Sequence, residues 1–128
     1  MESLNDFRWV GCENSLDRYG WSVPCFYEDI AECYIKLKKP MDAFKHFERA
    51  LEAWLTTLDL GPLYERAENT GIVSGAHKCM KAFQEALLLP PPASEGAEAS
   101  ALRGYYEGRA KELEKKLPER LQTFQRKI

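Results

Sequence analysis

The stretch PMDAFKHFERALEAW, residues 40–54, places small and bulky apolar side chains at the spacing of one helix face. That face consists of Ala43, Phe47, Ala50, Leu51 and Trp54. Small residues let two helices approach closely, and a ring between them fills the groove beside the contact. The stretch therefore predicts a helix from about Met41 to Thr57 that packs tightly on its neighbours.

The flanking sequence is also helical in pattern, with almost no strand-like alternation. Proline and glycine divide it into segments of helix length. The segments DLGP (59–62), GIVSG (71–75) and PPPASEG (90–96) are expected to be breaks or turns. We expect six or seven antiparallel helices. Besides the helix that contains residues 40–54, three of them are expected at about 24–37, 62–72 and 76–89.

The last segment, from about residue 95, carries one apolar face through eight positions at an average interval close to the helical period. These positions are Leu102, Tyr106, Ala110, Leu113, Leu117, Leu121, Phe124 and Ile128. Pro118 lies inside the pattern and either kinks this helix or starts a second one. We expect Tyr106, Ala110 and Leu113 to contact the helix that holds Phe83. The part after Pro118 either folds back on the domain or extends beyond it as an exposed patch.

Two segments repeat one pattern with a shift of 36 residues, DAFKHFERALE (42–52) and KCMKAFQEALL (78–88). Phe47 falls on Phe83, and Ala50 falls on Ala86. Helix pairs that recur every thirty to forty residues are typical of α-solenoids. We expect five residues of these pairs to be buried: Tyr34, Phe47, Ala50, Phe83 and Ala86.

Residues 24–57 resemble a tetratricopeptide repeat. The residues that carry the resemblance are Tyr27, Ile30, Ala31, Tyr34, Ala43, Phe47 and Ala50. A second unit, 60–93, is degenerate: it keeps Leu63, Ala67, Cys79, Phe83, Ala86 and Pro91 but departs from the pattern at Arg66 and Thr70. The resemblance implies an all-α fold of antiparallel helix pairs, stacked as a short tetratricopeptide-like α-solenoid. Residues 1–128 then form one domain, with an N-terminal helix or half repeat at 1–21 and C-terminal capping or extension helices at 94–128.

The resemblance also implies a function, because this family binds a peptide or helix of a partner protein in a concave groove. The residues expected to line that groove are Glu28, Asp29, Glu32, Lys36, Tyr64, Glu65, Glu68 and Asn69. The branch of the family that clamps acidic chaperone C-termini uses basic residues and asparagine there. This chain has mostly acids at those places, so a basic or mixed partner is expected.

Two alternatives stay open. The chain is also consistent with a structural subunit that oligomerises, as a homodimer for example, through a C-terminal interface of Leu121, Phe124 and Ile128. Nucleic acid binding would use basic residues near the C-terminal end, which are Lys111, Lys115, Lys116, Arg120, Arg126 and Lys127. Interleaved glutamates and the net charge of −2 argue against that alternative.

The sequence contains none of the common enzyme or nucleotide-binding motifs, so no catalytic residues and no cofactor are expected. Its four cysteines form no CxxC pair, so no metal site is expected. The first residues carry no secretory signal pattern, and no window of 18 residues is apolar throughout. We therefore expect a protein with reduced thiols in the cytoplasm or nucleus, away from membranes.

Overall fold

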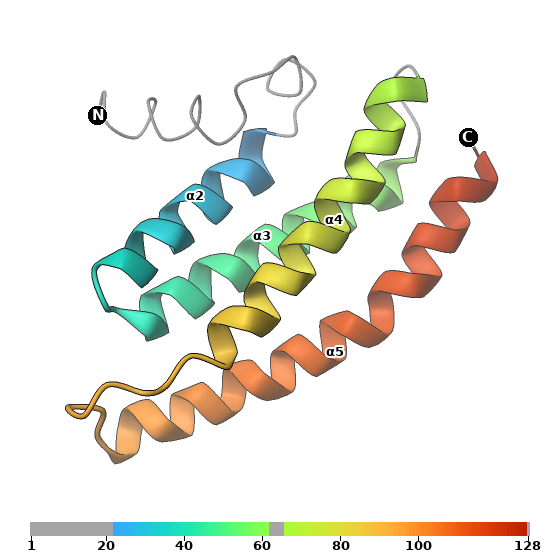
Figure 1. The fold of residues 1–128 in the computed structure, drawn as a ribbon. Helices are drawn as coiled ribbons and strands as arrows, with labels where there is room; N and C mark the ends of the chain where they lie inside the picture. The colour runs from blue at the N-terminus through green and yellow to red at the C-terminus, as the bar shows by residue number, and fades with distance from the viewer. Residues whose placement is uncertain (1–21, 62–65, 128) are drawn as a thin grey trace.

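The computed structural model describes residues 22–61 and 66–127, which form four helices and no strand. The helices are α2 (Ser22–Lys36), α3 (Pro40–Leu60), α4 (Arg66–Leu87) and α5 (Ala97–Lys127). Consecutive helices run antiparallel, and α5 lies along the outside of the α3–α4 pair (Figure 1). The predicted all-α class is confirmed. The helix expected within 1–21 lies outside the described residues.

Helix α3, which contains the opening stretch, is the centre of the fold because it packs against all three other helices. Pro40 suits its first turn, since proline has no N–H to leave unpaired there. Gly61 ends the helix with φ of 85°, and its N–H donates to the Leu58 carbonyl. The buried face of α3 consists of Ala43, Phe44, Phe47, Ala50, Leu51, Trp54, Leu55 and Leu58.

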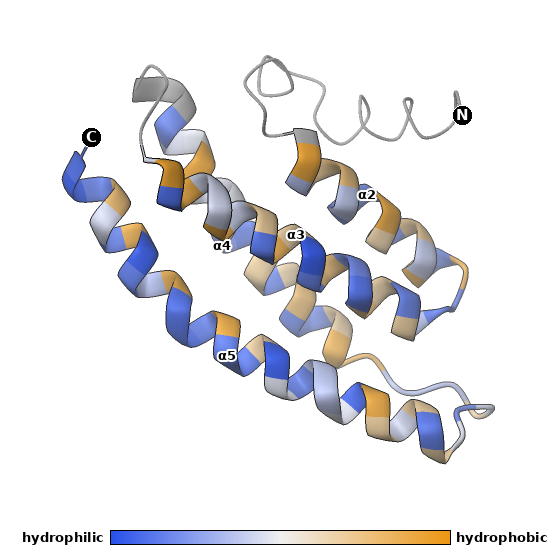
Figure 2. Cartoon of the chain, turned by 180° about the vertical axis from the view of Figure 1, so that it is seen from behind, coloured by the Kyte–Doolittle hydropathy of each residue, from blue (hydrophilic) through white to orange (hydrophobic). Residues whose placement is uncertain are grey.

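Aromatic rings join the helices through this face. Phe47 stacks on Phe83 of α4 with ring centroids 5.9 Å apart, and Phe44 lies 5.9 Å from the ring of Tyr106 on α5. Hydrophilic residues lie along most of α5 and also along the length of α3, where they alternate with hydrophobic ones (Figure 2). Four of the five residues predicted to be buried are buried, and Tyr34 is only half-buried.

The predicted break at residues 71–75 is wrong, because α4 is one helix from Arg66 to Leu87. The cause lies in Trp54, whose ring occupies the space beside Gly75 where any other residue would place its Cβ. Gly75 therefore serves close packing rather than a turn. As a result, the described residues contain four helices where the sequence predicts at least five.

The helix pair predicted for residues 24–57 is present as α2 and α3, joined at residues 37–39. The second pair predicted within 60–93 is not formed in the described residues, since residues 66–87 are a single helix. The stacked-pair solenoid is therefore not confirmed for residues 22–61 and 66–127. Instead, α4 and α5 cover α3 as two long helices (Figure 1).

Helix α5 continues through Pro118 and folds back along the domain. Tyr106, Ala110, Leu113 and Leu117 are buried, as predicted for a capping helix. Leu121 is 5% exposed and Phe124 is fully buried, so the alternative of an extended tail with an exposed patch is wrong for these two residues. Ile128 lies outside the described residues, and Leu102, at the start of the predicted face, is exposed.

Candidate interaction surface

The residues predicted to line a concave groove do not form one exposed surface in the described part of the chain. On α2, Glu32 and Lys36 are exposed, whereas Glu28 and Asp29 are partly buried. Asn69 on α4 is buried. Tyr64 and Glu65 lie outside the described residues, as does the side chain of Glu68. Of the three acids predicted to line the groove from α2, Glu32 is the one that is exposed.

Glu28 instead turns its carboxylate toward the point where α2, α3 and α4 meet. It accepts hydrogen bonds from the Trp54 indole N–H, at 3.4 Å, and from the Cys79 thiol. The pKa of Glu28 is raised to about 7, because the effect of burial is larger than the opposing effect of these two hydrogen bonds. Burial and the neighbouring Glu28 charge also raise the pKa of the Cys79 thiol. Cys79 is therefore a protonated donor in the core, a role unlike that of a reactive thiolate.

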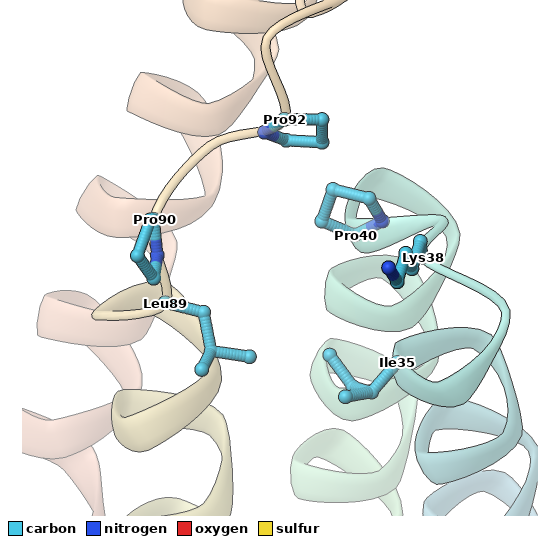
Figure 3. A pocket seen from close by; sticks show the side chains of 6 residues that line it. All are labelled: Ile35, Lys38, Pro40, Leu89, Pro90 and Pro92. Carbon is cyan, nitrogen blue, oxygen red and sulfur yellow. The ribbon is translucent and has the colours of Figure 1, made fainter.

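A hollow of about 370 Å³ lies between the α2–α3 turn and the loop that follows α4 (Figure 3). Ile35, Lys38 and Pro40 line one wall, and Leu89, Pro90 and Pro92 line the other. We call these six residues the turn–loop groove. Apart from the ammonium group of Lys38, its lining side chains are apolar.

The first wall follows from a tight reversal at the end of α2. The N–H of Lys38 donates to the Ile35 carbonyl and that of Lys39 to the Tyr34 carbonyl, at 3.0 and 2.9 Å. Lys38 adopts φ of 60° in this turn, and Pro40 then starts α3. The reversal leaves Ile35, in the last turn of α2, facing the opposite loop (Figure 3).

The second wall follows from the end of α4. The N–H groups of Leu88 and Leu89 donate to carbonyls three residues earlier, which tightens the last turn. Pro90, Pro91 and Pro92 then stop the helix, because they lack the N–H that would continue its hydrogen bonds. Leu89 is consequently left beside the groove with 46% of its surface exposed.

A second hollow, of about 330 Å³, adjoins the turn–loop groove and shares Lys38, Pro40 and Pro92 with it. Its other lining residues are Lys39, Met41, Asp42, Ser94, Glu95 and Ala99. The loop side of this hollow is braced by Arg103, which donates to both Glu95 carboxylate oxygens at 2.8 and 3.1 Å. These hydrogen bonds hold the pKa of Glu95 below its usual value. Arg103 also lies over the Phe44 ring, 5.0 Å from its centroid, and so links the loop to α3.

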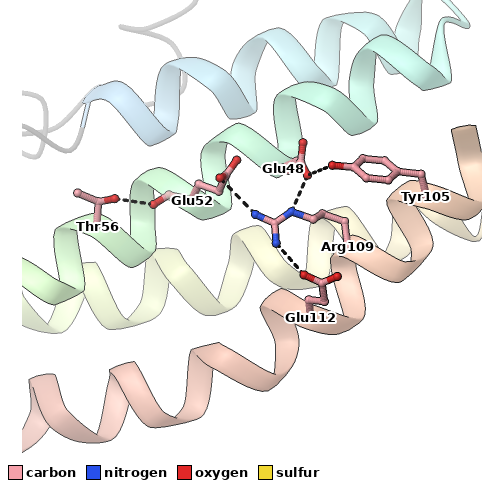
Figure 4. Close-up of polar contacts among 6 residues, drawn as sticks. All are labelled: Glu48, Glu52, Thr56, Tyr105, Arg109 and Glu112. Atoms are coloured by element: carbon pink, nitrogen blue, oxygen red, sulfur yellow. Dashed lines mark hydrogen bonds and ion pairs between the residues drawn. The ribbon is translucent and has the colours of Figure 1, made fainter.

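A charge cluster around Arg109 joins α3 to α5 (Figure 4). Arg109 reaches Glu48 at 2.8 Å, Glu112 at 3.1 Å and Glu52 at 3.3 Å, and the Tyr105 hydroxyl also donates to Glu48. The cation is surrounded by its own carboxylates, so this cluster serves the packing of two helices. Its cation, Arg109, is only 19% exposed and is therefore not available to a ligand.

The outer face of α5 mixes both signs of charge. Lys111, Lys115 and Lys116 are exposed, but so are Glu107, Glu112, Glu114 and Glu119. Arg120 is paired with Asp59 of α3. This face therefore lacks the concentrated positive charge that a nucleic acid backbone favours.

Sequence reasoning missed the turn–loop groove because it treated KLKKP and LLLPPP only as helix ends. A signal was present, since both segments end in proline and carry bulky apolar residues close to it. Leu37, Leu88 and Leu89 remain exposed in the structure. Apolar residues that no helix face can bury, next to a helix stop, indicate surface contacts.

In comparisons with family models, curated proteins and solved structures, no significant match to this chain was found. The tetratricopeptide resemblance therefore rests on the residues alone and stays a prediction. Within 22–61 and 66–127, no helix has both the length and the apolar character that a membrane span requires. Among the described cysteines, Cys33 and Cys79 are free thiols.

Proposed function

We propose that this protein is a non-enzymatic interaction module that binds a peptide segment of a partner protein in the turn–loop groove. The observation that carries the proposal is an apolar hollow of about 370 Å³ that opens at the surface between two proline-ended helix boundaries. Binding pockets in proteins are mostly apolar clefts of about 300–1,000 Å³ with a few polar groups, and this hollow fits that description.

Exposed apolar residues at the same end of the helix bundle support the proposal. Leu37 follows α2, and Leu88 and Leu89 follow α4; these leucines are 63%, 83% and 46% exposed. The antiparallel order of the helices brings both segments to one end (Figure 1). Apolar surface gathered in this way is typical of protein contacts.

The resemblance of residues 24–57 to a tetratricopeptide repeat supports the same class of function, because that family binds peptides. The surface proposed here is different, since it lies at the helix ends rather than along the face of α2. The alternative of oligomerisation through Leu121 and Phe124 has less support, because both side chains are used in the core.

The test is a selection of peptides from a random phage-displayed library on the immobilised protein. Selected peptides are expected to bind Leu89→Asp about tenfold more weakly or worse, because a carboxylate would enter the apolar hollow. The matched control is Leu60→Asp, an exposed leucine at the opposite end of α3, and it should bind like the wild type. Failure to enrich any peptide, or equal binding to Leu89→Asp, would overturn the proposal.

A further inference from the structure

Positive charge gathers at one wall of the turn–loop groove. Residues 36–39 contain three exposed lysines, Lys36, Lys38 and Lys39. Among the described residues, none of the three has an ion-pair partner. Lys38 lines both adjoining hollows and Lys39 lines the second, so their ammonium groups are available to whatever occupies them.

The acids near these lysines do not cancel their charge. Glu95 lines the second hollow, but both its oxygens are held by Arg103 and its side chain is 5% exposed. Asp42 is the remaining acid in the lining of the two hollows, and its single negative charge is smaller than the combined charge of Lys38 and Lys39. The turn wall therefore carries a net positive charge that the protein does not neutralise within the described residues.

The prolines restrict how a partner can be recognised. Pro40, Pro90 and Pro92 line the groove and have no backbone N–H to donate. A partner strand cannot extend a ladder of main-chain hydrogen bonds along such a wall. Recognition must come from apolar contact inside the hollows and from the lysine side chains, each of which presents three donors and one charge.

We propose that the turn–loop groove takes an acidic segment of a partner protein, an inference that rests on the peptide-binding function proposed above. One or two bulky apolar side chains of the segment enter the adjoining hollows. Aspartate or glutamate residues beside them pair with Lys38 and Lys39. This charge is opposite to that of the basic or mixed partner predicted from the acids of α2, because the proposed contact lies at a different surface.

Three pools of fluorescein-labelled short peptides test the inference by fluorescence anisotropy. All share a central Leu-Phe pair, and their flanks contain only Asp and Glu, only Lys and Arg, or only Ser and Gly. The acidic pool is expected to bind about tenfold tighter than the other two at about 50 mM salt. The preference should shrink at about 300 mM salt, because exposed charges are then screened.

A charge reversal at the groove, with a matched reversal elsewhere, locates the effect. Lys38→Glu with Lys39→Glu should abolish the preference for acidic flanks. Lys111→Glu with Lys115→Glu, on the outer face of α5, changes net charge equally and should retain it. A far-ultraviolet circular dichroism spectrum checks that both double variants keep the helical fold.

The outcomes separate the two proposals. If the neutral or basic pool binds as tightly as the acidic pool, and Leu89→Asp abolishes that binding, the groove binds peptides but the inferred partner charge is wrong. An unchanged acidic preference in the Lys38 and Lys39 double variant would also overturn the inference. If no pool binds, or if Leu89→Asp has no effect on binding, the proposed function fails together with it.

Discussion

Gly75 shows at the scale of one residue how packing overrides local preference. A Cβ at this position would collide with the ring of Trp54. Alanine is the better helix former by about 1 kcal/mol, yet overpacking costs about 1–3 kcal/mol. We expect Gly75→Ala to lower the free energy of unfolding, as measured by urea denaturation.

Gly104 and Gly108 on α5 provide the control, because a Cβ at either position would meet no other part of the protein within 4 Å beyond the adjoining backbone of α5. Replacing either one with alanine should stabilise the protein by about 0.5–1 kcal/mol. A stabilisation of the same size in Gly75→Ala would contradict the packing of Trp54 against α4.

Glu28 predicts a dependence of stability on pH. Its pKa in the folded protein is about 7, compared with an ordinary value of 4.5, so the folded state binds more protons between these values. The contribution of Glu28 to stability is therefore most favourable below pH 4.5 and is lost as pH rises through 7. Ionisation of the partly buried carboxyl group is the cause of the loss.

Glu28→Gln removes that ionisation. Between about pH 5 and about pH 8, the free energy of unfolding of the variant should rise by about 1–3 kcal/mol relative to that of the wild type. The reason is that one pKa unit corresponds to about 1.4 kcal/mol. Urea denaturation of both proteins at the two pH values measures the gain. If the two proteins differ in free energy of unfolding by the same amount at both pH values, Glu28 does not titrate in this range.

Helix α5 illustrates the next scale, that of the element. Its apolar face continues on both sides of Pro118, because Leu113 and Leu117 are buried before the proline and Leu121 and Phe124 are buried after it. Phe124→Ala should lower the free energy of unfolding by about 3–5 kcal/mol through the cavity it leaves. Leu102→Ala, at the exposed start of the same face, should cost less than about 1 kcal/mol. Equal costs in chemical denaturation would show that the end of α5 is not part of the core.

At the scale of the whole molecule, α2 and α3 form a pair that needs the rest of the chain. Phe44 lies against Phe83 and Tyr106, and the ring of Trp54 lies against Gly75. A fragment of residues 22–61 would expose these rings to water. We expect it to lose most of its helical signal by circular dichroism, because short helices depend on tertiary packing for their stability. A stably helical fragment would instead indicate an autonomous repeat.

Much of the fold could be predicted from periodicity. The spacing of Ala43, Phe47 and Ala50 correctly gave α3 and its buried face, and the stripe from Tyr106 to Phe124 correctly gave the core side of α5. The candidate site could not be predicted in the same way. Its walls come from residues 35–40 and 89–92, whose closeness depends on how α4 returns alongside α3.

The sequence by itself determined the helical class, the faces that α3 and α5 bury and the proline stops, because these depend on interactions between residues a few positions apart. The tertiary structure alone decided that Gly75 lies within a helix, that Glu28 faces the core and that the two proline-ended segments enclose a groove. Each of these depends on a side chain or segment far away in the sequence: Trp54, Cys79 and the loop after α4. Local spacing carries no information about such contacts, since packing between helices sets them.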